Sequence, residues 1–396
     1  MRLTKLFVVI FVALLIVIGA IAAVQFADRA NNPVKLVTPS GPIKITIASA
    51  VAAEPWISAA AKAFSGKEYM VNDRKQQILV EVFPIDGVTA LAKWANGEFQ
   101  TPPTAWVAES RDWVNQANAV AADRTKQDIF LAGGQYRDQS VSMSPEIWAI
   151  FKSRSDVLQK KFGRPIDWQV VYLAATSKGW ADLGGSSAWG RFKLVIPHPK
   201  RDPAGLAAIV SAAGAYYDKP AVSADELKDL KFLAWLKDML NTVVDFQPYG
   251  AENMLLYGPS AGDAGQVLEN YLLLNAESIE KRWQDGIQVY YPDPVAWYDF
   301  PFTIYMGKEK ETSAAEKDAA VSFKQFLLSK EQQVATLRFG LRPASPDVAT
   351  DDPASLIKKY AKMGFQERVP SASKMRQASR TALVQLGTWF VDNYEK

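Results

Sequence analysis

The pattern of apolar and polar positions predicts strands that alternate with helices in the first part of the chain. Residues 43–47 alternate apolar and polar side chains with a period of two, which is typical of a strand. Glu54-Pro55 then opens a segment with apolar residues at helical spacing. Similar strand patterns follow at 78–83 and 104–107, and helix patterns at 89–96 and 110–118. Because such strands are joined by right-handed crossovers, we expect an α/β lobe with a largely parallel sheet covered on both faces.

A second α/β unit is predicted after an extended segment at 142–152. Its patterns indicate a strand at 192–196 and helices at 203–216, 224–240 and 265–274. Aromatic, strand-like runs at 288–291 and 300–306 indicate that the chain returns to the first lobe, and capping-box patterns at Ser313 and Ser329 begin two further helices. A last helix is expected from about 372 to 394. The expected division is 43–148 for the first part of lobe 1, 149–295 for lobe 2, and 296–396 for the return to lobe 1 and the C-terminal helices.

The N-terminus has the pattern of an export signal or a membrane anchor. Arg2 and Lys5 precede a run from Leu6 to Val24 without a polar side chain. As a helix at roughly 1.5 Å per residue the run would rise about 28 Å, which favours a retained anchor over a signal-peptide core. Ala20-Ile21-Ala22 also fits a cleavage site, so a cleaved signal stays the alternative. We predict a signal or anchor helix over 1–30, a linker over 31–42, and a folded body outside the cytoplasm.

Composition narrows the classes of function. With 396 residues, 48% of them hydrophobic, the chain exceeds one compact domain of typical size and suits two lobes. Its 45 basic and 42 acidic residues leave a net charge of +3 with no basic tract, so no nucleic-acid partner is expected. Cysteine is absent and histidine occurs once, which excludes thiolate catalysis, disulfides and a zinc site built from several Cys or His.

Several segments, taken in their order along the chain, resemble the bacterial extracellular solute-binding proteins of the type II periplasmic fold, near the molybdate- and sulfate-binding proteins. The segments are the strand and loop at 43–50 with the helix that follows, 83–96 with 103–108, 197–205, 262–267, and a tail at 326–333 and 340–343. The resemblance implies two lobes joined by a hinge, with a small polar solute captured between them and delivered to the permease of an ABC-type importer. It implies no cofactor, no metal and no catalytic residue.

The resemblance also implies that loops leading into helices contact the solute with backbone amides and hydroxyls. The candidate ligand-binding residues are Ser49, Ala50, Asp86, Val88, Thr89, Ala204, Gly205 and Asp263. Where oxyanion-binding relatives usually have a small, serine-rich turn, this chain has Asp86-Gly87-Val88-Thr89. A carboxylate that faced the cleft would repel an anion, so the identity of the solute stays open.

Other motifs have simpler explanations. Asp138-x-Ser140-x-Ser142 spells the metal-site tripeptide of von Willebrand A domains, but no apolar strand precedes it. His198 lies between two prolines, and the sequence has no Gly-x-Ser-x-Gly elbow to pair with it. Tyr290-Tyr291 is similar to the tyrosine pair of ferric-iron-binding relatives, although aromatic residues entering a strand more often pack.

Two more groups of residues suggest particular solutes. Trp180, Trp189 and Trp297 would suit stacking against a sugar, with core packing as the simpler interpretation. Asp202, Asp263 and Glu269 would suit a cation or a polyamine, with helix capping as the simpler interpretation.

A different class remains as the alternative to transport. A membrane-anchored receptor or scaffold with the same fold, working with a von Willebrand A partner, would also use a long anchor and the Asp86 turn. An enzyme is not expected, because the sequence has no nucleophile with a matching base.

Overall fold

The computed structural model describes residues 41–71, 74–369, 374–376 and 378–395. The predicted anchor helix at 1–30 and nearly all of the linker lie outside these residues. Within the described ranges no helix combines the length and the apolar character needed to cross a membrane. The chain divides into two units at Pro42, and the fold below is that of the unit beginning at Ile43.

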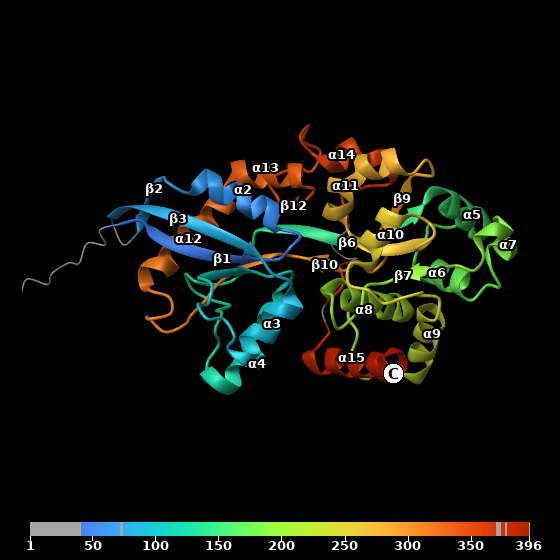
Figure 1. Ribbon diagram of the computed structural model, residues 1–396, viewed down its shortest axis with the longest axis horizontal. Coiled ribbons are helices and arrows are strands. Elements are labelled where there is room, and N and C mark those ends of the chain that lie inside the picture. The colour runs from blue at the N-terminus through green and yellow to red at the C-terminus, as the bar shows by residue number, and fades with distance from the viewer. Residues whose placement is uncertain (1–40, 72–73, 370–373, 377, 396) are drawn as a thin grey trace, which may run out of the picture. The chain divides into compact units, whose positions relative to one another are not determined.

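The first of two sheets defines the first lobe (Figure 1). Its strand order is β2-β3-β1-β4-β11-β5. The strands are β1 (Ile43–Ser49), β2 (Glu68–Val71), β3 (Arg74–Pro84), β4 (Ala105–Val107), β5 (Gln139–Ser140) and β11 (Pro301–Ile304). β1 is parallel to β3 and β4, as the alternation of strands and helices predicts. The outer strands β2, β11 and β5 pair antiparallel, because β2 joins β3 as a hairpin and β11 returns from the other lobe.

The second sheet defines the second lobe and is mostly antiparallel. It contains β6 (Ser142–Phe151), β7 (Leu194–Val195), β8 (Ala264–Leu268), β9 (Ile287–Tyr290), β10 (Trp297–Tyr298) and β12 (Arg342–Pro343). β6 pairs antiparallel with β8, β9, β10 and β12, and only β7 and β8 are parallel. The prediction of a helix over 265–274 is therefore wrong in its first part. Residues 264–268 form a buried strand, and the helix begins at Glu269.

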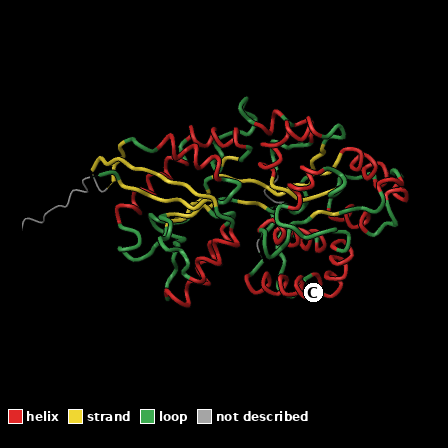
Figure 2. The backbone as a smooth tube through the Cα atoms, in the orientation of Figure 1, coloured by secondary structure: helices red, strands yellow, loops and turns green. Residues whose placement is uncertain are grey.

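Helices flank both sheets (Figure 2). Around the first sheet lie α2 (Glu54–Phe64), α3 (Gly87–Asn96), α4 (Arg111–Thr125), α12 (Ala314–Leu327) and α13 (Lys330–Thr336). Around the second lie α5 (Lys152–Phe162), α6 (Trp168–Ala175), α7 (Trp180–Leu183), α8 (Pro203–Tyr217), α9 (Leu230–Leu240), α10 (Gly250–Tyr257), α11 (Glu269–Arg282), α14 (Leu356–Lys359) and α15 (Arg380–Tyr394). Short 3₁₀ turns are η1 (Ser187–Trp189), η2 (Glu226–Lys228), η3 (Leu337–Phe339) and η4 (Ala361–Met363).

Each sheet has a hydrophobic core on both faces, built by the period-two alternation of strand side chains. In β4, Ala105 and Val107 join the core under α2 and α12, while Trp106 joins the core under α3 and α4. In β6, Trp148 and Ile150 face one core and the neighbouring residues face the other. The C-terminal helix α15 buries Leu386 and Phe390 in the second lobe.

Among the described residues, three connections join the lobes. One runs from α13 through η3 to β12, and the other two form an antiparallel pair. The chain leaves the first sheet through β5 into β6, and it returns through β10 into β11. These connections pair with each other at Tyr298 and Ser144 and again at Pro301 and Ser140. Two adjacent strands that cross between lobes are a suitable place for a hinge, because a small change in their dihedral angles moves one lobe against the other.

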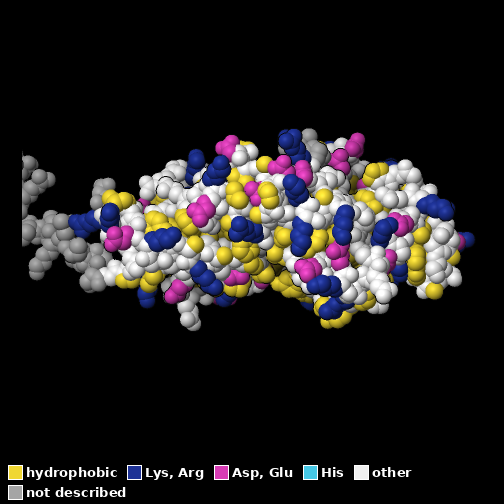
Figure 3. Space-filling view, turned by 90° about the horizontal axis from the view of Figure 1, so that it is seen from above, with side chains coloured by type: hydrophobic (Ala, Val, Ile, Leu, Met, Phe, Trp, Pro, Cys, Tyr) yellow, Lys and Arg dark blue, Asp and Glu magenta, His cyan; other side chains and the backbone are white. Residues whose placement is uncertain are grey.

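The face of the molecule in Figure 3 carries Lys and Arg interspersed with Asp and Glu. No single-sign patch of the size that a nucleic acid needs gathers on that face. The mixed surface agrees with the net charge of +3 over the whole sequence.

Candidate functional site

A cavity of about 390 Å³ lies between the two lobes. The first lobe contributes residues that follow the carboxyl ends of β1, β3 and β4, which is where α/β sheets place their ligands. The second lobe contributes the start of α8 together with α10 and α11. The described lining residues are Val51, Ala52, Pro55, Asp86, Glu109, Arg201, Asp202, Pro203, Ala204, Tyr249, Glu252, Asn253, Leu268, Asn270, Tyr271, Leu274 and Tyr298.

The start of α3 is occupied by carboxylates of the first lobe itself. Asp86 caps the helix: Oδ1 accepts from the Thr89 amide at 2.9 Å and Oδ2 accepts from the Thr89 hydroxyl at 2.7 Å. Glu109 approaches from the end of β4, and its Oε1 accepts from the Gly87 amide at 2.7 Å. Glycine is required at 87, because a Cβ there would stand 2.6 Å from Glu109 Oε2 and 2.9 Å from Trp113.

One aspartate similarly occupies two helix starts in the second lobe. Asp202 Oδ1 accepts from the Ala204 amide at 2.9 Å and caps α8. Its Oδ2 accepts from the Tyr249 amide at 3.0 Å, immediately before α10. Asp202 is buried, and both of its carboxylate oxygens accept hydrogen bonds from backbone amides.

Several polar atoms at the cavity have no hydrogen-bond partner among the described residues. They are Glu109 Oε2, Glu252 Oε2, Asn270 Oδ1 and the Tyr298 hydroxyl. Glu109 and Tyr298 are each 5% exposed, so their polar atoms are shielded from bulk water. A buried polar group without a partner carries a desolvation cost of about 1–3 kcal/mol, which a suitable ligand would remove.

The low dielectric of the cavity shifts its carboxyl groups toward the neutral form. Burial raises the pKa of Glu109 to about 8, and the charges of Asp86 and Asp202 act in the same direction. Burial also raises the pKa of Glu252 to about 7, with a smaller contribution from Asp202. The pKa of Glu146, fully buried in β6, is raised by burial and by the charges of Asp202 and Glu252.

A hydrogen bond closes the rim of the cavity across the two lobes. Asn270 at the start of α11 donates through Nδ2 to the Ala52 carbonyl of the first lobe at 2.9 Å. The backbone N–H of Asn270 donates to Ser144 Oγ at 3.2 Å, next to the crossing strands. Because the Ala52 carbonyl is an acceptor, the amide orientation of Asn270 follows from the contact, and its Oδ1 is left for a donor.

The structure brings two of the eight predicted ligand-binding residues, Asp86 and Ala204, into the cavity lining. Ser49 and Ala50 are buried behind it, where the Ala50 amide pairs with the Val107 carbonyl at 2.7 Å. Val88 and Thr89 lie in the first turn of α3. Gly205 packs against the chain at Pro197, whose carbonyl would stand 2.2 Å from a Cβ.

Asp263 lies elsewhere, in a buried network of the second lobe. Its Oδ1 lies 3.2 Å from Arg154 Nε, and its Oδ2 accepts from Trp180 Nε1 at 3.1 Å and from the Lys193 amide at 2.9 Å. The Arg154 guanidinium in turn stacks over Trp189 at 3.9 Å. These contacts give Asp263 and two of the candidate tryptophans a structural role.

Glu269 and the tyrosine pair are engaged in separate contacts. Glu269 forms a two-point ion pair with Arg342, at 2.6 Å to Nε and 2.8 Å to Nη2, and also accepts from the Tyr291 hydroxyl. The Tyr290 hydroxyl lies 2.5 Å from Ser155 Oγ. Within the part of the chain that the structure describes, no three His, Cys, Asp or Glu side chains lie close enough together to hold a metal ion.

The remaining motifs also have structural partners. Asp138 pairs with Arg111 at 2.5 Å, and Ser140 Oγ donates to Asp299 at 3.0 Å. His198 Nδ1 accepts from the Lys200 amide at 3.1 Å, and its Nε2 lies 2.8 Å from Glu395. Both ring nitrogens of His198 are therefore already in use.

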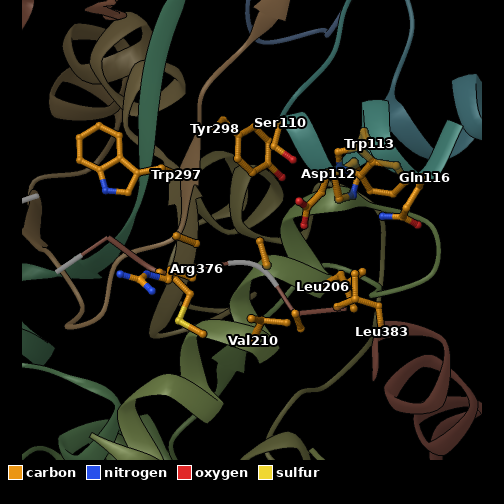
Figure 4. Close-up of a pocket in the computed structure, with 15 residues that line it drawn as sticks. Ser110, Asp112, Trp113, Gln116, Leu206, Val210, Trp297, Tyr298, Arg376 and Leu383 are labelled. Carbon is orange, nitrogen blue, oxygen red and sulfur yellow. The ribbon is translucent and has the colours of Figure 1, made fainter. Parts of the chain in front are cut away.

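A smaller hollow of about 70 Å³ borders the same crossing strand (Figure 4). Its residues come from α4, α8, β10 and the segment before α15, as the close-up shows for Asp112, Leu206, Trp297 and Arg376. Tyr298 lines both spaces. The smaller hollow is too small for most organic solutes. Two other hollows, of about 570 and 480 Å³, are each lined by one lobe alone, so the 390 Å³ cavity is the candidate site between the lobes.

Sequence patterns missed several residues that line this cavity. Glu109 directly follows the third predicted strand, so the rule that ligands sit beyond strand ends would have found it. Tyr249 is the N-cap of α10 and Glu252 lies in its first turn. No capping pattern in the sequence predicts this helix, because its N-cap is a tyrosine with φ of 58°. Tyr298 and Asn270 join the site only through the crossing of the chain between lobes.

Solved structures with the same architecture include an ABC transporter protein, a ferric binding protein and a periplasmic binding protein. An ABC transporter protein from Clostridium perfringens matches with a TM-score of 0.56 and 11% identity, over 89% of this chain and 98% of that one. A ferric binding protein from Campylobacter jejuni matches with a TM-score of 0.54 and 14% identity, over 89% and 98%. A periplasmic binding protein from Actinobacillus pleuropneumoniae, with fructose-6-phosphate bound, matches with a TM-score of 0.54 and 15% identity, over 90% and 99%.

At these identities the likeness establishes the fold. Two α/β lobes, two crossing strands and a cavity between the lobes give the chain the fold of the type II periplasmic binding proteins. The chain belongs to the family described as bacterial extracellular solute-binding protein, whose family model matches residues 45–342. Among curated proteins, none matches the sequence.

Proposed function

We propose that this protein captures a small polar solute in the cavity between its lobes, outside the cytoplasm, and delivers it to the permease of an ABC-type importer. The observation that carries the proposal is the cavity itself, because loops from both lobes line it and leave buried polar atoms without partners. A ligand that satisfied those atoms from both sides would hold the lobes together.

The proposed contacts combine predicted and newly found residues. Asp86 and Ala204 were expected from the sequence as ligand contacts, and Asp202 as a cation ligand or a helix cap. Glu109, Glu252, Asn270 and Tyr298 are added by their position at the cavity. No step of covalent chemistry is proposed, since the relatives in this family are binding proteins of transporters.

Ligand-induced stabilisation of the purified full-length chain in mild detergent tests the proposal. A compound that binds the folded protein at 100 times its Kd adds about 2.7 kcal/mol of stability, which raises the melting temperature by a few degrees. We expect at least one compound from a panel of amines, sugars, amino acids and oxyanions to do so. If every class leaves the melting temperature unchanged, capture of a small solute is contradicted and a receptor or scaffold role gains weight.

A further inference from the structure

The helix starts that could bind an anion at the cavity are already occupied by the protein's own carboxylates. Glu109 and Asp86 accept from amides in the first turn of α3, and Asp202 accepts from amides at the starts of α8 and α10. A helix start binds an anion through free amides and the positive end of the helix dipole. Here the chain supplies both the amides and the anions, so an incoming oxyanion would meet negative charge.

The polar atoms without partners favour a ligand that donates hydrogen bonds. Glu109 Oε2 and Glu252 Oε2 are carboxyl oxygens, and Asn270 Oδ1 is an amide oxygen fixed as an acceptor by the contact with Ala52. Tyr298 offers a hydroxyl, which donates or accepts. In their ionised form Glu109 and Glu252 accept hydrogen bonds, so a ligand that satisfies the set in that form must bring donors. A bound cation favours the ionised form of both carboxyl groups. Glu109 is the strongest indication, because it is 95% buried, lines the cavity and keeps one oxygen without a described partner.

The charged residues around the cavity also favour a ligand that is not an anion. Its lining contains four carboxyl side chains, those of Asp86, Glu109, Asp202 and Glu252. Within the described part of the lining, Arg201 supplies the positive charge, and it is exposed to solvent. Solvent screens an exposed charge more than a buried one, so the buried carboxyl groups dominate the field inside.

The remaining walls are apolar or aromatic. They are formed by Val51, Pro55, Pro203, Tyr249, Leu268, Tyr271 and Leu274. A bare metal ion would make no contact with these apolar walls. Among the described residues, the carboxyl groups also do not form a cluster of three or more that could hold a metal ion. Aromatic rings beside carboxylates suit an organic cation, whose carbon body packs on the walls while its charged end reaches the acidic groups.

We infer that the solute is an organic cation bearing N–H donors, a primary or secondary ammonium or a guanidinium, whose charged end binds Glu109 Oε2 and Glu252 Oε2. The inference rests on the proposed capture function and names the chemical class that the same cavity takes. The lobes share the ligand, because Glu109 belongs to the first lobe and Glu252 to the second.

The test measures binding to the full-length chain by calorimetry with agmatine and putrescine as probes. Choline, which has a positive charge without N–H donors, separates charge from hydrogen bonding. Maltose, sulfate and fructose 6-phosphate represent neutral and anionic solutes. We expect agmatine or putrescine to bind at least about tenfold more tightly than choline, and the anions to show no binding.

Variants locate the binding. Glu109→Gln keeps an oxygen that can accept from the Gly87 amide and removes the charge, so helix α3 should keep its start. We expect it, and Glu252→Gln, to weaken the amine by about tenfold or more. Asp112→Asn is the matched control, because Asp112 is a partly buried carboxyl whose pKa is raised to about 7 but which lines the smaller hollow.

The outcomes separate the two proposals. Binding of sulfate, fructose 6-phosphate or maltose without the amines would overturn the cationic solute and leave capture standing. Amine binding that is unchanged in both Glu109→Gln and Glu252→Gln would overturn the assigned contacts. Binding by none of the three classes would overturn capture itself, and the inference with it.

Discussion

Glu109 accepts a hydrogen bond of 2.7 Å from the amide of Gly87, which ties the end of β4 to the start of α3. The contact places a carboxylate where an anion-binding protein would offer an open helix start. It also leaves Glu109 Oε2 at the cavity without a described partner. One side chain thus both closes the fold of the first lobe and sets the sign of the charge in the site.

The first prediction concerns the stability of the ligand-free protein as a function of pH. The pKa of Glu109 is raised to about 8 in the folded state, from 4.5 as the ordinary value, so between these values the folded state binds more protons than the unfolded state. The free energy of unfolding should therefore fall as pH rises from about 5 to about 8. Glu252, with a pKa raised to about 7, acts in the same direction.

Glu109→Gln should reduce that fall, because the side chain no longer ionises. At pH 8 the variant should be more stable than the parent by a few kcal/mol, since each unit of pKa shift is worth about 1.4 kcal/mol. Urea unfolding at pH 5.5 and pH 8 measures both proteins. A parent whose stability rises between these pH values, or a variant that follows the parent at both, would contradict the assignment.

The second prediction concerns the contact that closes the rim. Asn270→Ala removes the hydrogen bond from Nδ2 to the Ala52 carbonyl across the lobes and should lower solute affinity several-fold, because the closed form loses about 1 kcal/mol. Small-angle scattering of the ligand-free variant should show a larger radius of gyration than the parent.

Asn275→Ala is the control for this experiment. Asn275 lies on the same helix and donates to the Tyr271 carbonyl, one turn away, at 2.8 Å, so its contact does not cross between the lobes. Its loss should leave the scattering profile unchanged. Equal effects of the two substitutions would argue that Asn270 acts on helix α11 and not on closure.

The third prediction concerns the buried ion pair that joins α11 to β12. Arg342 pairs with Glu269 through two nitrogens at 2.6 and 2.8 Å, and both side chains are buried. Arg342→Met should destabilise the protein by about 3–5 kcal/mol, because it leaves the Glu269 carboxyl buried without its cation. The double variant Arg342→Met with Glu269→Leu should recover much of the loss.

An exposed pair on the same helix provides the comparison. Glu277 and Lys281 lie 2.7 Å apart at i and i+4, and Lys281→Met should leave the free energy of unfolding nearly unchanged, because solvent screens this exposed pair. Denaturant unfolding measures all variants. A small loss in Arg342→Met, comparable to that in Lys281→Met, would show that the buried pair does not support the fold.

The sequence was most informative where local patterns decide the structure. The alternation at 43–47 predicted β1, and the Ser313-x-x-Glu316 pattern predicted the start of α12, where the complete capping box forms. The prediction for 264–268 was wrong because this short strand is buried on both faces along most of its length and so has no alternation to distinguish it from a helix.

The site depended on contacts that no local pattern encodes. Asn270 and Ala52 are 218 positions apart, and Tyr298 reaches the cavity because β10 pairs with β6. Asp202 was a candidate both for capping and for a cation, and the structure gives it the capping contacts to α8 and α10. The prediction that Asp86 would disfavour an anion needed its neighbours Glu109 and Glu252 before it could suggest a ligand class.

Proton linkage of binding tests the central claim most directly, because cations and anions give opposite signs. An ammonium bound at Glu109 favours the ionised carboxyl against the burial and the charges of Asp86 and Asp202 that raise its pKa to about 8. Tyr249, Glu252 and Tyr298 also face this region, with Arg201 at the exposed rim. Amines keep their charge up to about pH 9, so the protein's carboxyl groups control the response.

The measurement is calorimetric titration of agmatine into the full-length chain from pH 6 to pH 8.5, in two buffers with different ionisation enthalpies. We predict proton release on binding and an affinity that rises with pH, by up to about tenfold per unit below pH 8 where one proton is released. Proton uptake, or an affinity that falls as pH rises, would contradict a cation-binding site between the lobes.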